Sequence, residues 1–205
     1  MHSEAKLAIN LMQLKLPAAS PSPTPLLDLA PLTPQEAFAK SPGIGENVFG
    51  NMSVFDAIQT QVFPALYRSD ESVLICAPSG SDTLTAAEFA ICRNCMTKPT
   101  SRIVYLCPVE ILRENVKKRW QSHFKDLLSR EINCLTGDIS ADLKILEASS
   151  IVLADPRHWD LLTRRWKQRK IVQTVSLVIA DLLHYLGRSD IGPQYEISLS
   201  GSSFV

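Results

Sequence analysis

Short apolar runs alternate along the chain with segments whose apolar residues recur every three or four positions. The runs predict strands, and they span residues 72–77, 102–107, 131–135, 150–154 and 175–180. The recurring segments predict helices over 56–67, 83–96, 109–128, 141–147 and 155–166. Strands that are apolar throughout and alternate with helices indicate an α/β fold with a mostly parallel sheet covered on both faces.

Two of the predicted helices carry a clear apolar stripe. Residues 56–67 place Ile58, Val62 and Leu66 four positions apart, although Pro64 predicts a kink or an early end. Residues 109–128 repeat this spacing at Leu112, Val116, Trp120, Phe124 and Leu128. We therefore expect Trp120 in the core.

Seven of the chain's 13 prolines lie within residues 17–45, which predicts an extended, Pro-rich arm in place of a packed element. Four leucines of the arm need a surface to cover them, so we expect the arm to lie along the following domain. These are Leu26, Leu27, Leu29 and Leu32. The predicted organisation is an arm over 1–45, a folded domain over 46–198 and a tail over 199–205.

The chain has 205 residues, 21 Lys and Arg against 21 Asp and Glu, and 45% hydrophobic residues. These values predict one globular domain. The zero net charge excludes a basic coat for nucleic acid over the whole surface, although it leaves room for a local patch. No apolar stretch approaches the ~18 residues of a membrane span. Asn10, Gln13 and Lys15 interrupt the N-terminal apolar residues, which argues against a signal peptide.

Five cysteines are scattered among apolar segments, which is typical of reduced thiols packed as small hydrophobic residues. Cys92 and Cys95 form a CxxC pair, but a zinc site needs a second pair at matching spacing, and the sequence has none. Because the two cysteines fall one turn apart in the predicted helix 83–96, we prefer buried structural thiols to a metal or redox site.

Ligands bind beyond the carboxyl ends of parallel strands, so the loops at 77–84, 135–139 and 180–187 are the candidate sites. The first loop, APSGSDTLT, leaves a predicted strand and opens a helix. In this setting backbone N–H groups cradle a phosphate. Such a loop also uses a lysine for the phosphates and a Ser or Thr hydroxyl for Mg²⁺.

At this loop the sequence resembles motif I of the Ski-like DExH-box superfamily-two RNA helicases, APTGSGKT followed by a helix with AEFA. Other segments resemble the remaining motifs in order: FDAIQTQVFPALY the glutamine segment, YLCPVEIL, LTGDISADLKIL and DPRHWDLLTRRWKQRK motifs Ia, Ib and Ic, and IADLLHYLG motif II. The resemblance covers residues 9–197. It is strongest to the second of the two helicase cassettes in the Brr-type spliceosomal members.

The resemblance implies a RecA-like P-loop NTPase fold that binds ATP and Mg²⁺, a second RecA-like domain as partner, and RNA. It also implies splicing-factor partners and a place in the nucleus. The implied nucleotide-binding residues are Gln59, Ala77, Pro78, Ser79, Gly80, Ser81, Asp82, Thr83 and Leu84. Motif II is Asp181, Leu182, Leu183 and His184, with Asp181 as the Mg²⁺ ligand. The implied contact residues for nucleic acid or partners are Pro108, Thr136, Gly137, Pro156, Arg164, Arg165, Lys167, Arg169 and Lys170.

Three motifs depart from the family pattern. Residues 82–84 read Asp-Thr-Leu in place of Gly-Lys-Thr, which adds a carboxylate and removes the lysine. Leu182 replaces the glutamate of motif II, so no carboxylate remains there to orient an attacking water. Residues 155–157 read Asp-Pro-Arg in place of Thr-Pro-Glu, with Asp155 placed to cap a helix. We therefore expect a catalytically inactive domain that serves regulation and protein binding in pre-mRNA splicing.

Two alternatives remain open. One is part of an active ATP-dependent RNA helicase with an unusual phosphate loop, favoured by the retained Gln59, Gly80 and Asp181. The other is a domain that binds nucleotide without hydrolysing it. A helicase subunit of a transcription-coactivator or ribosome-quality-control complex is the alternative within the family. The sequence shows no motif III and no second RecA-like domain, so we expect it to be part of a longer cassette.

The five cations within 164–170 surround Trp166 and have two interpretations. They form either a docking patch for RNA or protein, or a solvated helix end whose charges complement the helix dipole. His184 is either a remnant of the motif II contact to the second domain or, as we prefer, a structural residue.

Overall fold

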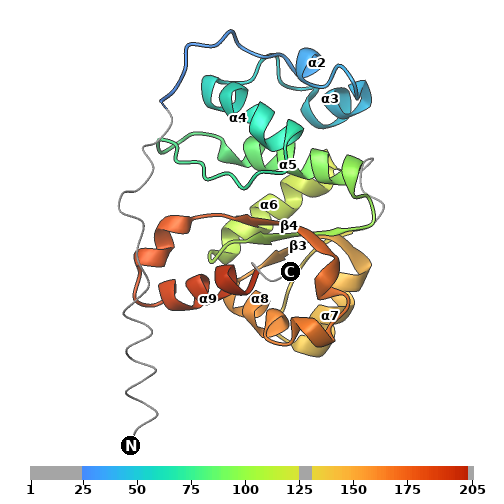
Figure 1. The fold of residues 1–205 in the computed structure, drawn as a ribbon, viewed down its shortest axis with the longest axis vertical. Helices are drawn as coiled ribbons and strands as arrows, with labels where there is room; N and C mark the ends of the chain where they lie inside the picture. Colours follow the sequence, from blue (N-terminus) through green and yellow to red (C-terminus); the bar gives the residue numbers. More distant parts are fainter. Residues whose placement is uncertain (1–24, 125–130, 203–205) are drawn as a thin grey trace, which may run out of the picture.

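The computed structural model describes residues 25–124 and 131–202. Its centre is a parallel sheet of four strands in the order β2-β3-β1-β4 (Figure 1). The strands span Arg102–Leu106 (β1), Glu131–Cys134 (β2), Ser149–Ala154 (β3) and Val175–Ala180 (β4). In the central strand, Val104 pairs with Val152 of β3 and with Val178 of β4. The predicted α/β class with a parallel sheet is confirmed.

Helices cover both faces of the sheet (Figure 1). On one side lie α2 (Pro34–Ala37), α3 (Pro42–Phe49), α4 (Ala57–Arg68), α5 (Thr83–Thr97) and α6 (Glu110–His123). On the other side lie α7 (Ile139–Ala148), α8 (Pro156–Thr163) and α9 (Gly192–Ser202). The 3₁₀ turns are η1 (Trp166–Gln168), η2 (Val172–Thr174) and η3 (Leu183–Gly187). Within 25–124 and 131–202, no helix combines the length and the hydropathy that a membrane span requires.

A hydrophobic core lies on each face of the sheet, which explains why the strands are apolar along their whole length. Tyr105 of β1 packs in one core with Phe89 and Trp120. Its neighbour Val104 packs in the other core with Trp159. Successive residues of a strand point to opposite faces, so a strand between two helical layers needs apolar side chains at every position. Trp120 lies in the core, as predicted.

The predicted strand at 72–77 is not formed. The segment is irregular and joins no sheet within the described residues, and Leu74 is 71% exposed. Its apolar composition favours a strand, but a strand is stable only when neighbours pair with its backbone and cover its side chains. The motif I loop therefore follows an irregular segment and not a strand of the sheet.

The arm is only partly extended. Residues 25–33 contain no helix or strand, but 34–49 form α2 and α3. Thr33 begins α2 with a capping box, and each of the two helices has a proline in its first turn. Phe38 and Phe49 are buried and stack with ring centroids 5.1 Å apart. This aromatic packing explains why the second half of the predicted arm is a folded part of the domain.

The first half of the arm lies along α4. The Gln61 side chain accepts a hydrogen bond from the Leu27 N–H at 2.8 Å and donates one to the Pro25 carbonyl at 2.9 Å. Leu32 packs against the core, whereas Leu26, Leu27 and Leu29 stay exposed. Of the four leucines, one is therefore covered as expected. Backbone hydrogen bonds to α4, and not burial of the other three leucine side chains, hold this part of the arm in place.

α4 corrects two details of the sequence interpretation. It continues through the exposed Pro64 to Arg68, so the proline does not end it within its 12 residues. Its buried face carries Gln59 and Phe63, whereas the predicted stripe of Ile58, Val62 and Leu66 is only half-buried. The buried face is thus rotated by one residue from the apolar stripe, because a buried, hydrogen-bonded glutamine belongs to it.

Two helix ends differ from the predictions, and one helix was not predicted. The helix at 109–128 ends at His123, and Leu128 lies outside the described residues. α8 ends at Thr163 and not near 166, because Arg169 donates two hydrogen bonds of 2.8 Å to the carbonyls of its last turn. α9 was not predicted. It crosses the predicted boundary at residue 198 and is held by its buried Tyr195.

Candidate functional site

Four loops meet at the end of the sheet where the parallel strands terminate. The predicted site residues follow the strands at Pro108 after β1, Thr136 and Gly137 after β2, Pro156 after β3, and Asp181 after β4. Because the strands are parallel and adjacent, these positions share one edge. The loop at 77–82 brings the start of α5 toward this side of the molecule (Figure 1). The predicted site residues therefore fall into three groups, called below the nucleotide side (the loop before α5), motif II (after β4) and the nucleic-acid side (after β1, β2 and β3) according to the sequence prediction.

Asp82 occupies the N-cap of α5, the position at which a phosphate was expected. Its carboxylate accepts hydrogen bonds from the Thr85 N–H at 3.4 Å and from the Thr85 hydroxyl at 2.8 Å. A helix N-terminus attracts an anion through its free N–H groups and its dipole. Here the anion is a side chain of the chain itself. Thr85, which carries a hydroxyl one residue beyond the family position, serves this cap.

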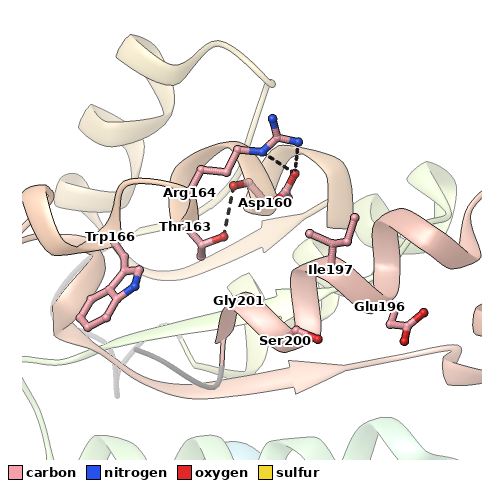
Figure 2. A pocket seen from close by; sticks show the side chains of 8 residues that line it. All are labelled: Asp160, Thr163, Arg164, Trp166, Glu196, Ile197, Ser200 and Gly201. Carbon is pink, nitrogen blue, oxygen red and sulfur yellow. Dashed lines mark hydrogen bonds and ion pairs between the residues drawn. The ribbon is translucent and has the colours of Figure 1, made fainter. Parts of the chain in front are cut away.

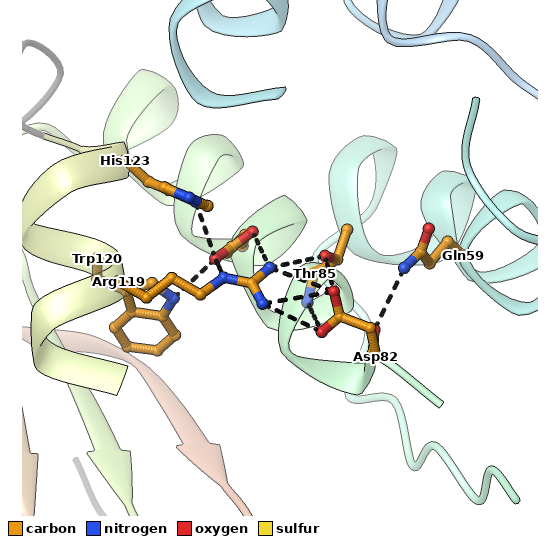
Figure 3. A network of polar contacts seen from close by, with 7 residues as sticks. Gln59, Asp82, Thr85, Arg119, Trp120 and His123 are labelled. Atoms are coloured by element: carbon orange, nitrogen blue, oxygen red, sulfur yellow. Dashed lines mark hydrogen bonds and ion pairs between the residues drawn. The ribbon is translucent and has the colours of Figure 1, made fainter. Parts of the chain in front are cut away.

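Arg119 of α6 faces Asp82 across the start of α5 (Figure 3). Its Nη1 lies 3.3 Å from Oδ1 of Asp82, and its Nη2 lies 2.9 Å from the Thr85 hydroxyl. Partial burial raises the pKa of Asp82, but the hydrogen bonds from Thr85 and the charge of Arg119 outweigh it and hold this pKa below its usual value. Asp82 is therefore a stable carboxylate at neutral pH.

The same guanidinium binds Glu88, one turn further along α5. Arg119 Nε and Nη2 lie 2.8 and 3.0 Å from the two Glu88 oxygens, and the Trp120 indole donates to Glu88 at 3.0 Å. His123 Nδ1 lies 3.3 Å from the same carboxylate (Figure 3). Glu88 is fully buried, and burial raises its pKa despite Arg119. The network Asp82–Arg119–Glu88 thus joins α5 to α6.

Gln59, the predicted adenine-side residue, is buried, and both its amide oxygen and its amide nitrogen have a hydrogen-bond partner. Its Oε1 accepts from the Asp56 N–H at 3.0 Å as part of the cap of α4, and its Nε2 donates to the Asp82 carbonyl at 3.3 Å. The structure therefore brings two predicted residues together, Gln59 and Asp82. It uses the glutamine to fasten the phosphate loop to α4.

The remaining phosphate-loop residues form an exposed turn. Ser81 N–H donates to the Pro78 carbonyl at 3.2 Å, and Gly80 has φ +90°, a conformation that favours glycine. Pro78, Ser79 and Gly80 are exposed, and Ala77 is half-buried. At the start of α5, Thr83 is exposed and Leu84 packs against the core. No side chain within 77–84 is a cation.

Asp181 of motif II is hydrogen-bonded within the protein. Its carboxylate accepts from the Tyr105 hydroxyl at 2.5 Å and from the Leu182 N–H at 2.8 Å. The Tyr195 hydroxyl of α9 donates to the Asp181 backbone carbonyl at 2.5 Å. Burial, followed by the nearby Asp181 charge, raises the pKa of Tyr105 above its usual range. A Mg²⁺ ion would have to compete with these bonds.

The rest of motif II turns away from the strand. Leu182 has φ +56°, the left-handed region, and is followed by the 3₁₀ turn η3. Leu183 packs against the core on the α8 and α9 side, and the His184 ring lies edge-on to Tyr185 at 4.8 Å between centroids. His184 is exposed, and this ring contact is with its neighbour in the sequence, so both interpretations of His184 stay open.

On the nucleic-acid side, the loop after β2 is held by Asp142. Its carboxylate accepts from the N–H groups of Thr136 at 2.7 Å and of Gly137 at 2.9 Å. Gly137 has φ +92°, and a Cβ there would meet His158 Nε2 at 2.9 Å, so the position requires glycine. The backbone donors of this loop are therefore already occupied by an anion of the chain.

At the start of α8, Asp155 is the N-cap and Pro156 the first helical residue, as predicted. The Asp155 carboxylate accepts from the Arg157 N–H and from its Nε, both at 2.9 Å, and Arg113 Nη1 lies 3.6 Å away. Burial raises the pKa of Asp155, but these hydrogen bonds and charges outweigh it and lower the pKa below its usual value. Pro108 lies half-buried after β1, beside this site at the same edge.

The basic cluster at 164–170 lies at the opposite end of the sheet. α8 begins beyond the end of β3, and the chain must return to the start of β4 at Val175, so residues 164–174 lie near the beginning of the strands (Figure 1). Arg164 pairs with Asp160 at 2.6 Å, and Arg169 binds the end of α8. These cations therefore lie on a different surface from Pro108, Thr136, Gly137 and Pro156, because α8 carries the chain across the sheet.

Sequence reasoning missed the residues that complete these sites. They are Arg119 and Glu88 at α5, Tyr105 and Tyr195 at motif II, and Asp142 and Arg113 on the nucleic-acid side. One signal was available for Glu88, since a carboxylate on the apolar side of a helix needs a partner. The identity of that partner depends on how α5 and α6 pack.

The comparisons with known proteins agree with this fold. The family model of the DEAD/DEAH box helicases matches residues 56–202 of this chain. The chain is 40% identical over 203 residues to the human U5 small nuclear ribonucleoprotein 200 kDa helicase, covering 98% of this chain and 9% of that protein. It is 41% identical over 205 residues to the DExH-box ATP-dependent RNA helicase DExH12 of Arabidopsis thaliana, with 99% and 9% covered. The chain thus spans about a tenth of the length of these relatives.

Two further proteins are similar to this chain. The activating signal cointegrator 1 complex subunit 3-like protein of Dictyostelium discoideum is 38% identical over 206 residues, with 99% of this chain and 9% of that protein covered. The crystal structure of the DUF1998 helicase MrfA bound to DNA and AMPPNP has a TM-score of 0.58 at 16% identity, covering 82% of this chain and 22% of that one, which supports the RecA-like fold. The resemblance to Ski-like DExH-box helicases is confirmed, and the chain belongs to the DEAD/DEAH box helicase family.

Proposed function

We propose that the chain is a degenerate ATP-binding domain of a spliceosomal RNA helicase, which acts as a regulatory and protein-interaction module without hydrolysing ATP. The observation that carries this proposal is the Asp82 carboxylate at the N-terminus of α5, held there by Thr85 and Arg119. A nucleotide phosphate would meet a fixed negative charge at this position, and Thr83 supplies no cation in place of the lysine. ATP and Mg²⁺ therefore fit poorly to the residues present.

Motif II supports the same conclusion. Hydrolysis of ATP depends on positioning and on charge stabilisation, so each lost group costs orders of magnitude in rate. Leu182 supplies no carboxylate for an attacking water, and Asp181 is engaged by Tyr105. The fold is kept while the groups that act on phosphate are missing, which suits binding more than turnover.

The proposed setting follows from the relatives. The U5 small nuclear ribonucleoprotein 200 kDa helicases of Homo sapiens and Drosophila melanogaster are each 40% identical to this chain. We propose a nuclear role in pre-mRNA splicing, within the second of two helicase cassettes. A second RecA-like domain of the same cassette and splicing-factor proteins are the proposed partners, and RNA contributes weakly.

Isothermal titration of the chain with Mg·ATP, together with a phosphate-release assay, tests this proposal. The unaltered chain should show no micromolar binding and no release. The variant Asp82→Gly/Thr83→Lys/Leu84→Thr restores the family residues, and we expect it to gain affinity. Asp82→Gly alone is the matched control, since it removes the competing anion but adds no cation. Micromolar binding with hydrolysis by the unaltered chain would contradict the proposal.

A second candidate is an active ATP-dependent RNA helicase, favoured by Asp181 at the end of β4 and by the relative named for that activity. In a full-length protein, Asp181→Asn should then abolish RNA-stimulated ATP hydrolysis by this cassette. A domain that binds nucleotide without hydrolysis would instead show thermal stabilisation by Mg·ATP and no phosphate release.

A further inference from the structure

A groove of about 380 Å³ lies between the last turn of α8, η1 and α9 (Figure 2). Ile197 lines it from the outer side of α9 and is 53% exposed, whereas Tyr195 and Ser198 on the inner side of that helix are fully buried. Trp166 of η1 lines the opposite part of the groove. The groove therefore offers an uncovered apolar side chain and an aromatic ring at one place.

The polar groups of the α8 wall are already paired with each other. Arg164 donates through Nε and Nη2 to one oxygen of Asp160 at 2.9 and 2.6 Å. The Thr163 hydroxyl donates to the Asp160 carbonyl at 3.1 Å (Figure 2). These bonds pair the charged groups of the α8 wall, whereas the exposed Glu196 of α9 also lines the groove. The groove itself is therefore suited to an apolar side chain, and an acidic residue of a ligand would have to lie at the rim, away from Glu196.

The rim beside Trp166 is positively charged. Arg165, Lys167 and Lys170 are exposed, and none of them forms an ion pair with another residue of the described ranges. Lys167 Nζ lies 5.8 Å from the Trp166 ring centroid, so its charge sits directly at the groove. The whole chain has zero net charge, which makes three neighbouring unpaired cations a local feature.

We propose that this groove docks a peptide segment of a partner protein that carries an aliphatic or aromatic side chain flanked by acidic residues. The apolar side chain would lie against Ile197 and Trp166, and the acidic residues would face the cations of the rim. This deepens the proposed function, on whose interaction role it rests. The test of the groove involves no nucleotide. The groove proposal and the proposed lack of ATP hydrolysis can therefore each fail without the other.

RNA fits this surface less well than a peptide does. Stacking of a base needs an accessible ring face, and here the Trp166 ring has Lys167 beside it and is half-buried. The groove also lies at the opposite end of the sheet from the loops at Pro108, Thr136 and Pro156, so a strand of RNA along those loops would not reach it.

Selection from a random peptide library displayed on phage, with the full chain immobilised, provides the probe. The enriched peptides should combine Asp or Glu with a large apolar residue. One enriched peptide is then synthesised with a fluorescent label, and its affinity is measured by anisotropy. Ile197→Asp should weaken binding at least roughly tenfold, because it removes an apolar contact and adds a negative charge. Lys167→Glu should weaken binding several-fold.

Matched controls carry the same changes on α6, away from the groove. Ile111→Asp and Lys118→Glu alter exposed residues there and should leave the affinity unchanged. Ser200→Trp fills the groove from an exposed position and serves if Ile197→Asp disturbs folding, which circular dichroism reports. Any of three results would overturn the proposal: no enrichment over control phage, equal binding to the groove and α6 variants, or tighter binding of labelled single-stranded RNA that the groove variants abolish. Self-association lost in Ile197→Asp would assign the groove to a second copy and would also overturn it.

Discussion

The N-termini of α5 and α8 have the same kind of capping residue, but the two capping side chains differ in how far they are buried. Each helix is capped by an aspartate, Asp82 or Asp155, and each carboxylate is paired with an arginine. The Asp82 side chain is 42% exposed, whereas that of Asp155 is 5% exposed and also faces the nearly buried Arg113. The same kind of residue thus serves as a replaceable cap at α5 and as part of the packed interior at α8.

This difference bears on what each site could become. At α5, a loop change could expose the helix N-terminus without disturbing the core, so the nucleotide side is the more easily altered of the two. At α8, the carboxylate ties the strand end, the helix start and Arg113 together, and its removal would reach into the fold. Arg119 complicates the comparison, because it links the exposed cap of α5 to the fully buried Glu88.

The largest effect is expected for Arg119→Met. The change leaves Glu88 fully buried without its cation, although Trp120 and His123 still contact it. Removing one partner of a buried pair costs about 3–5 kcal/mol, and because the Arg119 side chain is 30% exposed we expect about 3 kcal/mol. Urea unfolding measures this loss. Lys118→Met on the same helix is the control and should change little. An equally small loss of unfolding free energy in the two variants would contradict a stabilising role for Arg119.

The two caps themselves give the next effect. We expect Asp155→Ala to lower the free energy of unfolding by about 2–3 kcal/mol, from a lost N-cap and a nearly buried ion pair. Asp82→Ala should cost about 1 kcal/mol, as for an ordinary N-cap with a solvent-screened pair. The difference between the two losses is the quantity to measure by urea unfolding. Equal losses would mean that burial does not distinguish the two helix starts.

The smallest effect concerns pH. Both aspartates have folded-state pKa values below the usual one, so the stability they add is complete above the unfolded pKa of about 3.9. It is lost as the pH falls through the folded-state values. The stability difference between the chain and Asp155→Asn should therefore shrink below pH ~4, and that for Asp82→Asn should shrink less. Glu88 has the opposite sign, since its raised pKa adds stability as the pH falls. A difference that grows toward low pH in the Asp155→Asn series would contradict this assignment.

Local patterns predicted what depends on local structure. The strands β1 to β4 follow from apolar runs, and the cap at Asp155 with Pro156 follows from adjacent residues. The segment 72–77 has the same apolar pattern and yet forms no strand, because a strand also needs a neighbour that the pattern does not reveal.

The candidate site divides in the same way. The charge change at Asp82 could be read directly, since its family position is known from the motif. Its partner Arg119 lies 37 positions away, and only the packing of α6 against α5 brings the two together. The position of the basic cluster at 164–170 also does not follow from local sequence, because it depends on where α8 ends and Arg169 binds the last turn of that helix.

Leu182 has an unfavourable backbone conformation, and hydrogen bonds to the preceding residue hold it there. A leucine in the left-handed region lies roughly 1–2 kcal/mol above its relaxed backbone conformation, and here φ is +56°. The bonds from Tyr105 and Tyr195 to Asp181 fix the preceding residue, so the turn cannot relax without giving them up. Because Tyr195 belongs to α9, undocking of that helix would remove one of these two bonds. The helix that the sequence pattern did not predict is thus hydrogen-bonded to motif II.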